Sequence, residues 1–175
     1  MGSITLITGG ARSGKSAHAL ELADRWRGAR RFFVATAEAL DDEMAARIQR
    51  HRADRAADFT TVEEPVNLAG VLEGLSARAD LVVVDCLTLW VANLMRVHAD
   101  AGAEALLNDA AALARTMVAA PYRVIVVTDE VGNGIVPDNP LARRFRDLLG
   151  WTNQTIAKAA AEVILMVAGY PICVK

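Results

Sequence analysis

The residues ITLITGGARSGKSAHALELA, 4–23, combine three local patterns without a gap. Apolar and β-branched residues at 4–8 predict a buried strand, two glycines follow, and an Ala- and Leu-rich segment predicts a helix. Lys15 lies at the start of that helix, where the helix dipole is positive and a second positive charge is unfavourable. A negatively charged ligand is therefore expected at this point.

Residues 9–16, GGARSGKS, fit the phosphate-loop pattern G-x-x-x-x-G-K-[S/T]. Glycines let successive backbone N–H groups turn toward phosphate oxygens, and the following helix adds its positive end. Lys15, expected to be exposed, would reach the β- and γ-phosphates, and the Ser16 hydroxyl would bind Mg²⁺. A glycine-rich turn without a ligand is the alternative. The expected nucleotide contacts are Gly9, Gly10, Ala11, Arg12, Ser13, Gly14, Lys15 and Ser16.

A second segment, LVVVDC at 81–86, has four apolar residues followed by an acid. This pattern predicts a buried strand that carries Asp85 at its carboxyl end, beside the metal of the nucleotide site. The alternative is an ordinary buried strand whose acid caps the next helix, and the two roles are compatible.

Short apolar runs alternate with Ala-, Leu-, Arg- and Glu-rich segments along the whole chain. Such alternation predicts an α/β fold, a doubly wound sheet of mostly parallel strands buried on both faces. The expected strands are 4–8, 31–36, 81–85, 122–128, 163–167 and 171–174, and the expected helices are 15–27, 41–54, 66–78, 87–117 with a break near Gly102, and 140–161. The long loop EVGNGIVPDNP, 130–140, leaves the carboxyl end of a strand, where ligands bind in such sheets.

The composition predicts a single globular domain over residues 1–175, with 53% hydrophobic and 23% charged residues. No apolar run has the length of a membrane span, and a net charge of −2 gives no excess of positive charge for binding a nucleic acid. Neither a membrane nor a nucleic acid is therefore an expected partner. Cys86 and Cys173 lack the spacing of a metal site and are expected to be reduced, buried thiols, which favours a cytoplasmic location.

A phosphate loop alone does not distinguish a switch, a motor and a group-transfer enzyme. The chain lacks the Asn-Lys-x-Asp motif that regulatory GTPases use to read guanine, and it lacks the basic loops of a DNA-dependent motor. The few arginines of 142–147 fit a solvated helix face or phosphate contacts. A small-molecule kinase or nucleotidyltransferase is favoured, and a P-loop ATPase or regulator that binds nucleotide and a protein partner is the alternative.

The helix predicted at 41–54 carries a histidine on its apolar face. Met44, Ile48 and His51 have the spacing i, i+4, i+7, so they share one side of the helix. A single histidine in such a position is more often a core residue than a catalytic one. The spacing by itself therefore favours a structural role for His51.

Three segments together resemble the bifunctional adenosylcobinamide kinase/adenosylcobinamide-phosphate guanylyltransferase family, the CobU/CobP type. They are ITGGARSGKSAHALELA (7–23), VATAEALDDEMAARIQRHRADR (34–55) and TDEVGNGIVPDNPLARRFRDLLGWTNQ (128–154). The resemblance implies a RecA-like sheet, a homotrimer and two reactions in cobalamin biosynthesis. ATP or GTP phosphorylates the aminopropanol hydroxyl of adenosylcobinamide, and GMP from GTP is then transferred to adenosylcobinamide phosphate through a GMP-histidine intermediate.

By position, the resemblance assigns the GMP-carrying histidine to His51, next to Arg50, where some members of the family have a second histidine. His51 and Lys15 are thus the expected catalytic residues, Ser16 and Asp85 the expected Mg²⁺ ligands, and GTP and ATP the expected substrates. Beyond the phosphate loop, the resemblance assigns nucleotide contacts to Ala35, Thr36, Ala37, Arg52, Ala53, Asp54, Arg55, Glu63 and Asp85.

Overall fold

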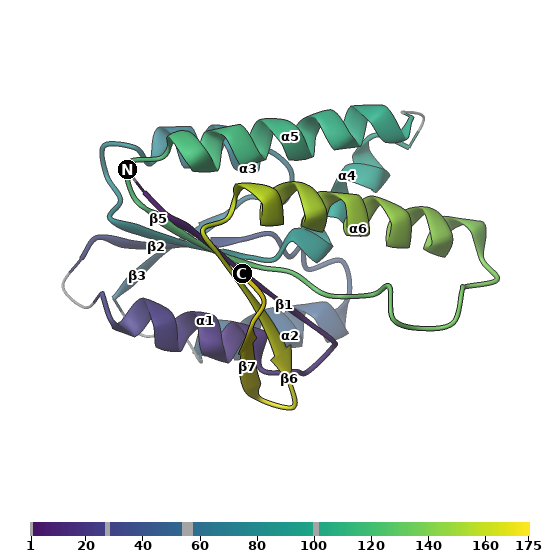
Figure 1. The fold of residues 1–175 in the computed structure, drawn as a ribbon, viewed down its shortest axis with the longest axis horizontal. Helices are drawn as coiled ribbons and strands as arrows, with labels where there is room; N and C mark the ends of the chain where they lie inside the picture. The colour runs from purple at the N-terminus through teal and green to yellow at the C-terminus, as the bar shows by residue number, and fades with distance from the viewer. Residues whose placement is uncertain (1, 27–28, 54–57, 100–101) are drawn as a thin grey trace.

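The computed structural model describes residues 2–26, 29–53, 58–99 and 102–175. Within these residues, strands and helices alternate along the chain (Figure 1). The strands are β1 (Ile4–Gly9), β2 (Arg31–Ala35), β3 (Phe59–Glu63), β4 (Leu81–Asp85), β5 (Arg123–Val127), β6 (Glu162–Val167) and β7 (Tyr170–Cys173). The helices are α1 (Lys15–Asp24), α2 (Asp42–Ala53), α3 (Leu68–Gly74), α4 (Leu87–Val97), α5 (Ala103–Ala119) and α6 (Pro140–Ala159).

The strands form one sheet in the order β3-β2-β4-β5-β1-β6-β7. Neighbours from β3 to β6 pair in parallel, and only the short β7 pairs antiparallel, with β6. The predicted α/β fold with a mostly parallel sheet is therefore confirmed. The strand order itself has a consequence for the site, because β5 lies between β4 and the phosphate-loop strand β1.

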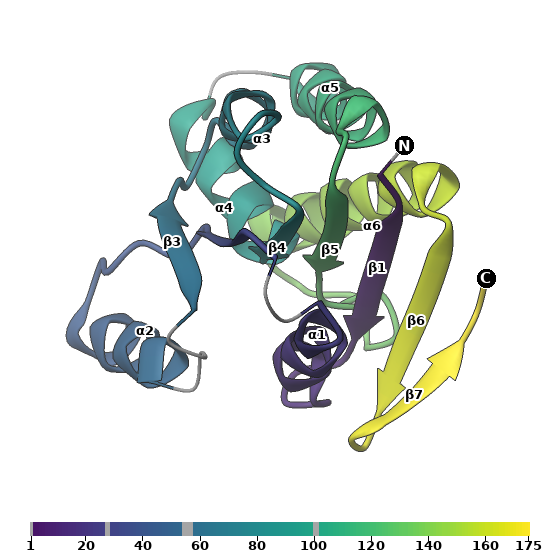
Figure 2. The ribbon, with the colours of Figure 1, turned by 90° about the vertical axis from the view of Figure 1, so that its left-hand side faces the viewer.

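Helices cover both faces of the sheet. α3, α4, α5 and α6 lie on one face, and α1 and α2 lie on the other (Figures 1 and 2). The larger core packs the first group against side chains of β1, β2, β4 and β5, and a smaller core packs α1 against the opposite face. Neither core, as formed by the described residues, contains a residue of α2. Figure 2 shows α2 beside β3, apart from α1.

The apolar runs predict most strands correctly and miss β3. Leu81–Asp85 matches the prediction, and the other expected strands differ from it by one or two residues at their ends. β3 is the outermost strand on its side of the sheet, and its side chains are half-buried or exposed. It therefore lacks the continuous apolar run that marks a strand covered on both faces.

The register of the sheet places several predicted site residues in one row. Ala35 pairs with Glu63 on one side and with Asp85 on the other, and Asp85 pairs with Val127 of β5. Each of these residues ends its strand, so the row marks the carboxyl edge of the sheet. Ligands bind at this edge in open α/β sheets. The phosphate loop, which follows β1, lies at the same edge.

The prediction of two buried cysteines is half wrong. Both cysteines are free, Cys86 is half-buried after β4, and Cys173 is exposed on the edge strand β7. Apolar neighbours in the sequence do not bury Cys173, because all the described side chains of β7 are exposed. Among the described residues, no helix is both long and apolar enough to cross a membrane.

Candidate active site

The phosphate loop joins β1 to α1 and needs glycine at both ends. Gly9 has φ 151° and Gly14 has φ 98°, values that residues with a side chain rarely adopt. A Cβ atom on Gly9 would lie 2.5 Å from the Met166 carbonyl oxygen and 2.7 Å from Ser13 Oγ. Gly14 is also the N-cap of α1 and makes no side-chain cap, so the first turn of the helix keeps free N–H groups for a ligand.

The middle of the loop is fixed by backbone hydrogen bonds. The Ser13 N–H donates to the Gly10 carbonyl at 3.2 Å, and the Ser13 carbonyl accepts from Gly169 N–H at 3.0 Å. The turn between β6 and β7 therefore supports the loop from the side. Ser13 Oγ is buried and has no hydrogen-bond partner in the described part of the chain. An unsatisfied buried hydroxyl at this place is available to an oxygen-rich ligand.

Lys15 is buried, with 8% of its surface exposed, so the expectation of an exposed lysine is wrong. Its Nζ donates to the Gly10 carbonyl at 2.7 Å and lies 2.6 Å from Asp129 Oδ1. The ammonium group is thus folded back over its own loop, held by one carbonyl and one carboxylate. Phosphate oxygens of a bound nucleotide can replace this carbonyl oxygen and this carboxylate oxygen as partners of the ammonium group.

Thr36, the first residue after β2, is held by hydrogen bonds within the fold. Thr36 is fully buried, and its Oγ1 donates to the Cys86 carbonyl at 2.7 Å and accepts from Cys86 N–H at 2.8 Å. Its N–H donates to the Asp85 carbonyl, and its own carbonyl accepts from Asn93. Thr36 therefore connects β2 to β4 and α4. A nucleotide contact of Ala35, Thr36 or Ala37 stays a prediction.

The structure brings two predicted residues together at the outer strand. Arg52 of α2 forms an ion pair with Glu63, the last residue of β3, and both side chains are half-exposed. The backbones of His51 and Ala53 belong to α2, whereas their side chains lie outside what the structure describes. Asp54 and Arg55 lie outside the described residues altogether. The ion pair nevertheless anchors the His51-bearing end of α2 to the carboxyl edge of the sheet.

Asp129 is a site residue that the sequence reasoning missed. It follows β5, the strand adjacent to β1, and its carboxylate contacts Lys15. A signal was present in the sequence, because the segment RVIVVTD has the same form as LVVVD, an apolar run followed by an acid. Asp85, assigned to the metal from that pattern, is half-buried at the end of β4, one strand further from β1.

The loop 130–140 is held by two arginines of α6. Arg146 donates to the carbonyls of Gly132, Gly134 and Ile135, and Arg143 donates to those of Pro137 and Asp138. These hydrogen bonds are exposed, so they are compatible with the expected solvated helix face, and they add a structural role that the sequence did not predict. They fix the backbone of a loop whose apolar tip is open to solvent, with Ile135 96% exposed.

Cys86 reports on the electrostatics of this edge. Burial, together with the negative charges of Asp85 and Asp129, raises the pKa of its thiol to about 12. The two carboxylates therefore both lie within electrostatic range of one sulfur atom. Of these two carboxylates, Asp129 also contacts Lys15 of the phosphate loop.

The two cysteines should differ sharply in reactivity. With iodoacetamide at about pH 8.5, the thiolate is the reacting form, so the exposed Cys173 should be alkylated at least about tenfold faster than Cys86, whose raised pKa keeps the thiol protonated. Mass spectrometry of peptides over a time course measures both rates. Cys173→Ser should then take up almost no reagent until the chain is unfolded. Equal labelling of the two cysteines in the native protein would contradict the environment of Cys86.

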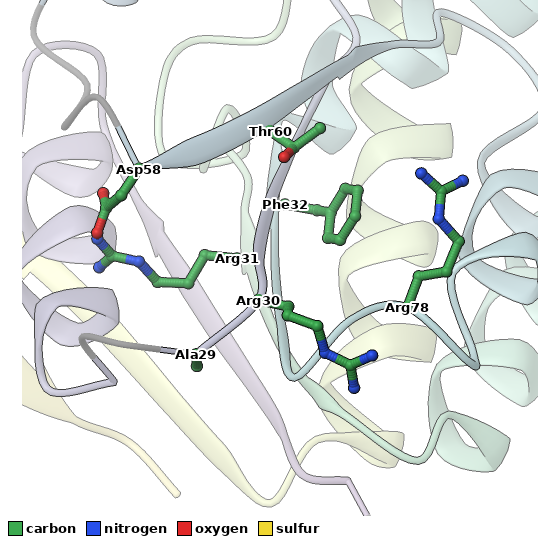
Figure 3. A pocket seen from close by; sticks show the side chains of 7 residues that line it. All are labelled: Ala29, Arg30, Arg31, Phe32, Asp58, Thr60 and Arg78. Carbon is green, nitrogen blue, oxygen red and sulfur yellow. The ribbon is translucent and has the colours of Figure 1, made fainter.

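A separate pocket opens at the amino ends of β2 and β3, opposite the phosphate loop. It has a volume of about 360 Å³ and is lined by Ala29, Arg30, Arg31, Phe32, Asp58, Thr60 and Arg78 (Figure 3). Its cations are already engaged: Arg30 pairs with Asp80, whose pKa it lowers to about 2, and Arg31 pairs with Asp24 and Asp58. The Arg78 guanidinium lies 5.6 Å from the centre of the Phe32 ring. The pocket lies at the edge of the sheet opposite Lys15 and Asp129.

A solved structure has a similar fold. The RadB recombinase aligns with a TM-score of 0.55 at 17% identity, covering 93% of this chain and 73% of the other. At this identity the likeness concerns the fold alone. The sheet order and the phosphate loop after β1 define a P-loop NTPase fold of the RecA type, as expected.

The sequence is also similar to known enzymes over nearly its full length. The profile of the family described as "Cobinamide kinase / cobinamide phosphate guanyltransferase" matches residues 5–174. The bifunctional adenosylcobalamin biosynthesis protein CobP of Pseudomonas aeruginosa is 42% identical over 170 residues, covering 97% of this chain and 96% of the relative. The corresponding CobU proteins of Escherichia coli and Salmonella typhimurium are 38% and 40% identical, covering 97% of this chain and 98% of each relative. The chain belongs to this family of kinase/guanylyltransferase enzymes, which confirms the predicted resemblance.

Proposed function

We propose that this one domain, residues 1–175, phosphorylates adenosylcobinamide with ATP or GTP and then transfers GMP from GTP to the product, with His51 as the GMP carrier. The observation that carries the proposal is the row of predicted residues at the carboxyl edge. The Arg52–Glu63 ion pair joins the His51-bearing end of α2 to the edge at which Asp85 and the phosphate loop also lie.

The chemistry fits a histidine nucleophile. An imidazole has a pKa near 6.5, so it is mostly neutral at pH 7 and needs no base to attack phosphorus. Its ring nitrogen would attack the α-phosphorus of GTP and release pyrophosphate, whose charge Lys15 and the loop N–H groups stabilise. A phosphate oxygen of adenosylcobinamide phosphate would then displace the histidine, which yields adenosylcobinamide-GDP and the free imidazole.

The sheet order sets a geometric requirement on this step. β3 and β1 are four strand positions apart, which corresponds to about 19 Å at about 4.8 Å per strand. α2 must therefore approach the phosphate loop for His51 to reach a nucleotide bound there. Such a movement costs little core packing, because α2 contributes no described residue to either core, and it requires the half-exposed Arg52–Glu63 ion pair to open.

Ser16 and Asp85 are the proposed ligands of Mg²⁺. Among the described residues no group of three or more His, Cys, Asp or Glu side chains could hold a metal by itself. This donor set suits Mg²⁺, which is usually bound by one or two carboxylates together with substrate phosphates. When bound, Mg²⁺ neutralises charge on the phosphate oxygens. The half-buried Asp85 and Ser16 supply the carboxylate and the hydroxyl.

Asp85→Asn should weaken the dependence on metal more than the affinity for nucleotide. The concentration of Mg²⁺ at half-maximal rate should rise at least about tenfold, since a neutral amide is a poorer Mg²⁺ ligand than a carboxylate. The dissociation constant of GTP in EDTA should stay within about twofold of the native value. Asp80→Asn removes a carboxylate at the opposite edge and serves as the control. Identical Mg²⁺ titrations of the Asp85 variant and the native enzyme would remove Asp85 from the metal site.

The resemblance to the family also leads us to propose a cytoplasmic homotrimer. Exposed apolar side chains are available for subunit contacts on β7 and on loop 130–140, among them Ile135, Val136, Tyr170 and Ile172. Exposed apolar surface of this kind often marks an interface. The net charge of −2 gives no support for a nucleic-acid partner.

Product analysis tests the proposed function. The purified protein is incubated with adenosylcobinamide, Mg²⁺ and either ATP or GTP. The corrinoids are then separated and identified by mass spectrometry. We expect adenosylcobinamide phosphate with either nucleotide and adenosylcobinamide-GDP only where GTP is present. A P-loop ATPase or regulator without group transfer would hydrolyse nucleotide and leave the corrinoid unchanged, and that result would overturn the proposal.

A further inference from the structure

The kinase reaction needs a group that accepts the proton of the attacking hydroxyl, and the Asp129 carboxylate lies beside the phosphate loop. Its Oδ1 lies 2.6 Å from Lys15 Nζ, and 29% of its side chain is exposed. The lysine of a phosphate loop contacts the β- and γ-phosphates of the bound nucleotide. A carboxylate in contact with that lysine therefore borders the position of the γ-phosphate.

The backbone of Asp129 is held in place independently of its carboxylate. Its N–H donates to Thr88 Oγ1 at 2.7 Å, and its carbonyl accepts from Asn153 Nδ2 at 3.0 Å. Thr128 Oγ1 in turn donates to Asn153 Oδ1 at 2.7 Å, and Glu130 N–H donates to the Gly9 carbonyl at 3.0 Å. Residues of α4, α6 and β1 thus fix the position from which the side chain projects. When phosphate oxygens replace the Asp129 carboxylate as the partner of Lys15, the carboxylate would remain next to the phosphate.

We propose that Asp129 is the general base of the phosphorylation step. Its carboxylate accepts the proton of the corrinoid hydroxyl while the hydroxyl oxygen bonds to the γ-phosphorus. The bond from that phosphorus to the β–γ bridging oxygen breaks, and the nucleoside diphosphate leaves with the electron pair. The proton passes from Asp129 to water after the product departs. The proposal rests on the kinase activity of the family.

The other acids near the edge are less well placed for this role. Asp85 ends β4, which β5 separates from the phosphate-loop strand. Glu63 is paired with Arg52 at the outer strand. The Glu130 carboxylate turns back on its own segment and accepts from Gly132 N–H at 2.5 Å. Asp129 is the acid that contacts the phosphate-loop lysine among the described ion pairs.

A base at this position would serve only one of the two reactions. Phosphorylation starts from an alcohol, whose proton must leave, so a positioned base accelerates this step by about 100- to 10,000-fold. Guanylyl transfer starts from a neutral imidazole and continues with a phosphate oxygen that is already ionised at pH 7, so neither half needs a base. Asp129 should therefore matter for the kinase step and hardly for the second step.

Asp129→Asn tests the proposal, with Glu130→Gln as a matched control that removes the neighbouring negative charge. Kinase turnover is measured with adenosylcobinamide, and guanylyl transfer is measured separately with adenosylcobinamide phosphate supplied. Titration calorimetry gives the dissociation constant of Mg²⁺-GTP, and thermal unfolding reports on the fold. We expect kinase kcat to fall about 100- to 10,000-fold, with guanylyl transfer within about threefold. The affinity for Mg²⁺-GTP should be unchanged or tighter, because Lys15 no longer has to leave a carboxylate.

Three results would overturn the assignment. Parallel loss of both activities would give Asp129 a structural or shared role, and a clear loss of Mg²⁺-GTP affinity would make it a metal ligand. Kinase turnover within about tenfold of the native rate would show that another group takes the proton. Failure of the proposed function as a whole looks different, because the native enzyme would then lack one of the two activities.

Discussion

Lys15→Ala should abolish both activities. In the proposed function the same phosphate loop holds the triphosphate in both reactions, and Lys15 is the cation of that loop. Loss of one such group that stabilises transition-state charge typically costs about 100- to 1000-fold in rate. Both rates should fall at least that far, measured in separate assays with adenosylcobinamide and with adenosylcobinamide phosphate.

The fold should survive this substitution with a small loss of stability. Asp129 loses its cation, but its side chain is 29% exposed, so water can solvate the carboxylate. A cost of about 1–2 kcal/mol is expected, which lowers the melting temperature by roughly 2–8 °C in a chain of this size. Lys158→Ala is the matched control, since Lys158 is exposed near the end of α6. Native rates in the Lys15 variant would contradict the assignment of the loop.

His51→Ala should separate the two activities. In the proposed mechanism guanylyl transfer uses a nucleophile of the enzyme, so its rate should fall by at least about 1000-fold. Phosphorylation of a hydroxyl uses none, and its rate should stay within a few-fold of the native rate. Both specific activities and the melting temperature are measured on the same preparation. His98→Ala, which removes an exposed histidine after α4, is the control.

The competing interpretation places His51 among core residues with Met44 and Ile48. Truncation would then open a cavity, lower the melting temperature and reduce both activities in parallel. Retained guanylyl transfer, or equal loss of both steps with a large drop in melting temperature, would rule out the carrier role. The half-burial of Met44 and Ile48, on a helix with no described residue in either core, favours the carrier interpretation.

Most strands can be predicted from the sequence, because strands that are buried on both faces consist of apolar residues. A strand such as Leu81–Asp85, with its apolar residues covered on both faces, leaves an unbroken apolar run in the sequence. β3 could not be found in this way, since its edge position allows polar side chains. The order of the strands could not be found either, because it depends on how the helices cross the sheet and no local pattern encodes it.

The site shows the same division. Gly9, Gly14 and Lys15 are readable from the sequence because a phosphate loop imposes residue types at fixed spacing. The burial of Lys15 and its contact with Asp129 depend on the placement of β5 beside β1, which brings together residues more than 100 positions apart. The hydrogen bonds between Thr36 and Cys86 likewise join segments that are far apart in the sequence, and no local pattern encodes them.

Labelled GTP tests the central claim, that GMP passes through a histidine of this chain. The native enzyme is incubated with Mg²⁺ and GTP labelled at either the α- or the γ-phosphate, without corrinoid, and the denatured protein is counted. We predict that only the α-label stays on the protein, that acid releases it while alkali does not, as for a phosphorus–nitrogen bond, and that peptide mapping places it on His51. Added adenosylcobinamide phosphate should then remove the label as adenosylcobinamide-GDP. Protein that carries no α-label, or carries it on a residue other than His51, would contradict the account.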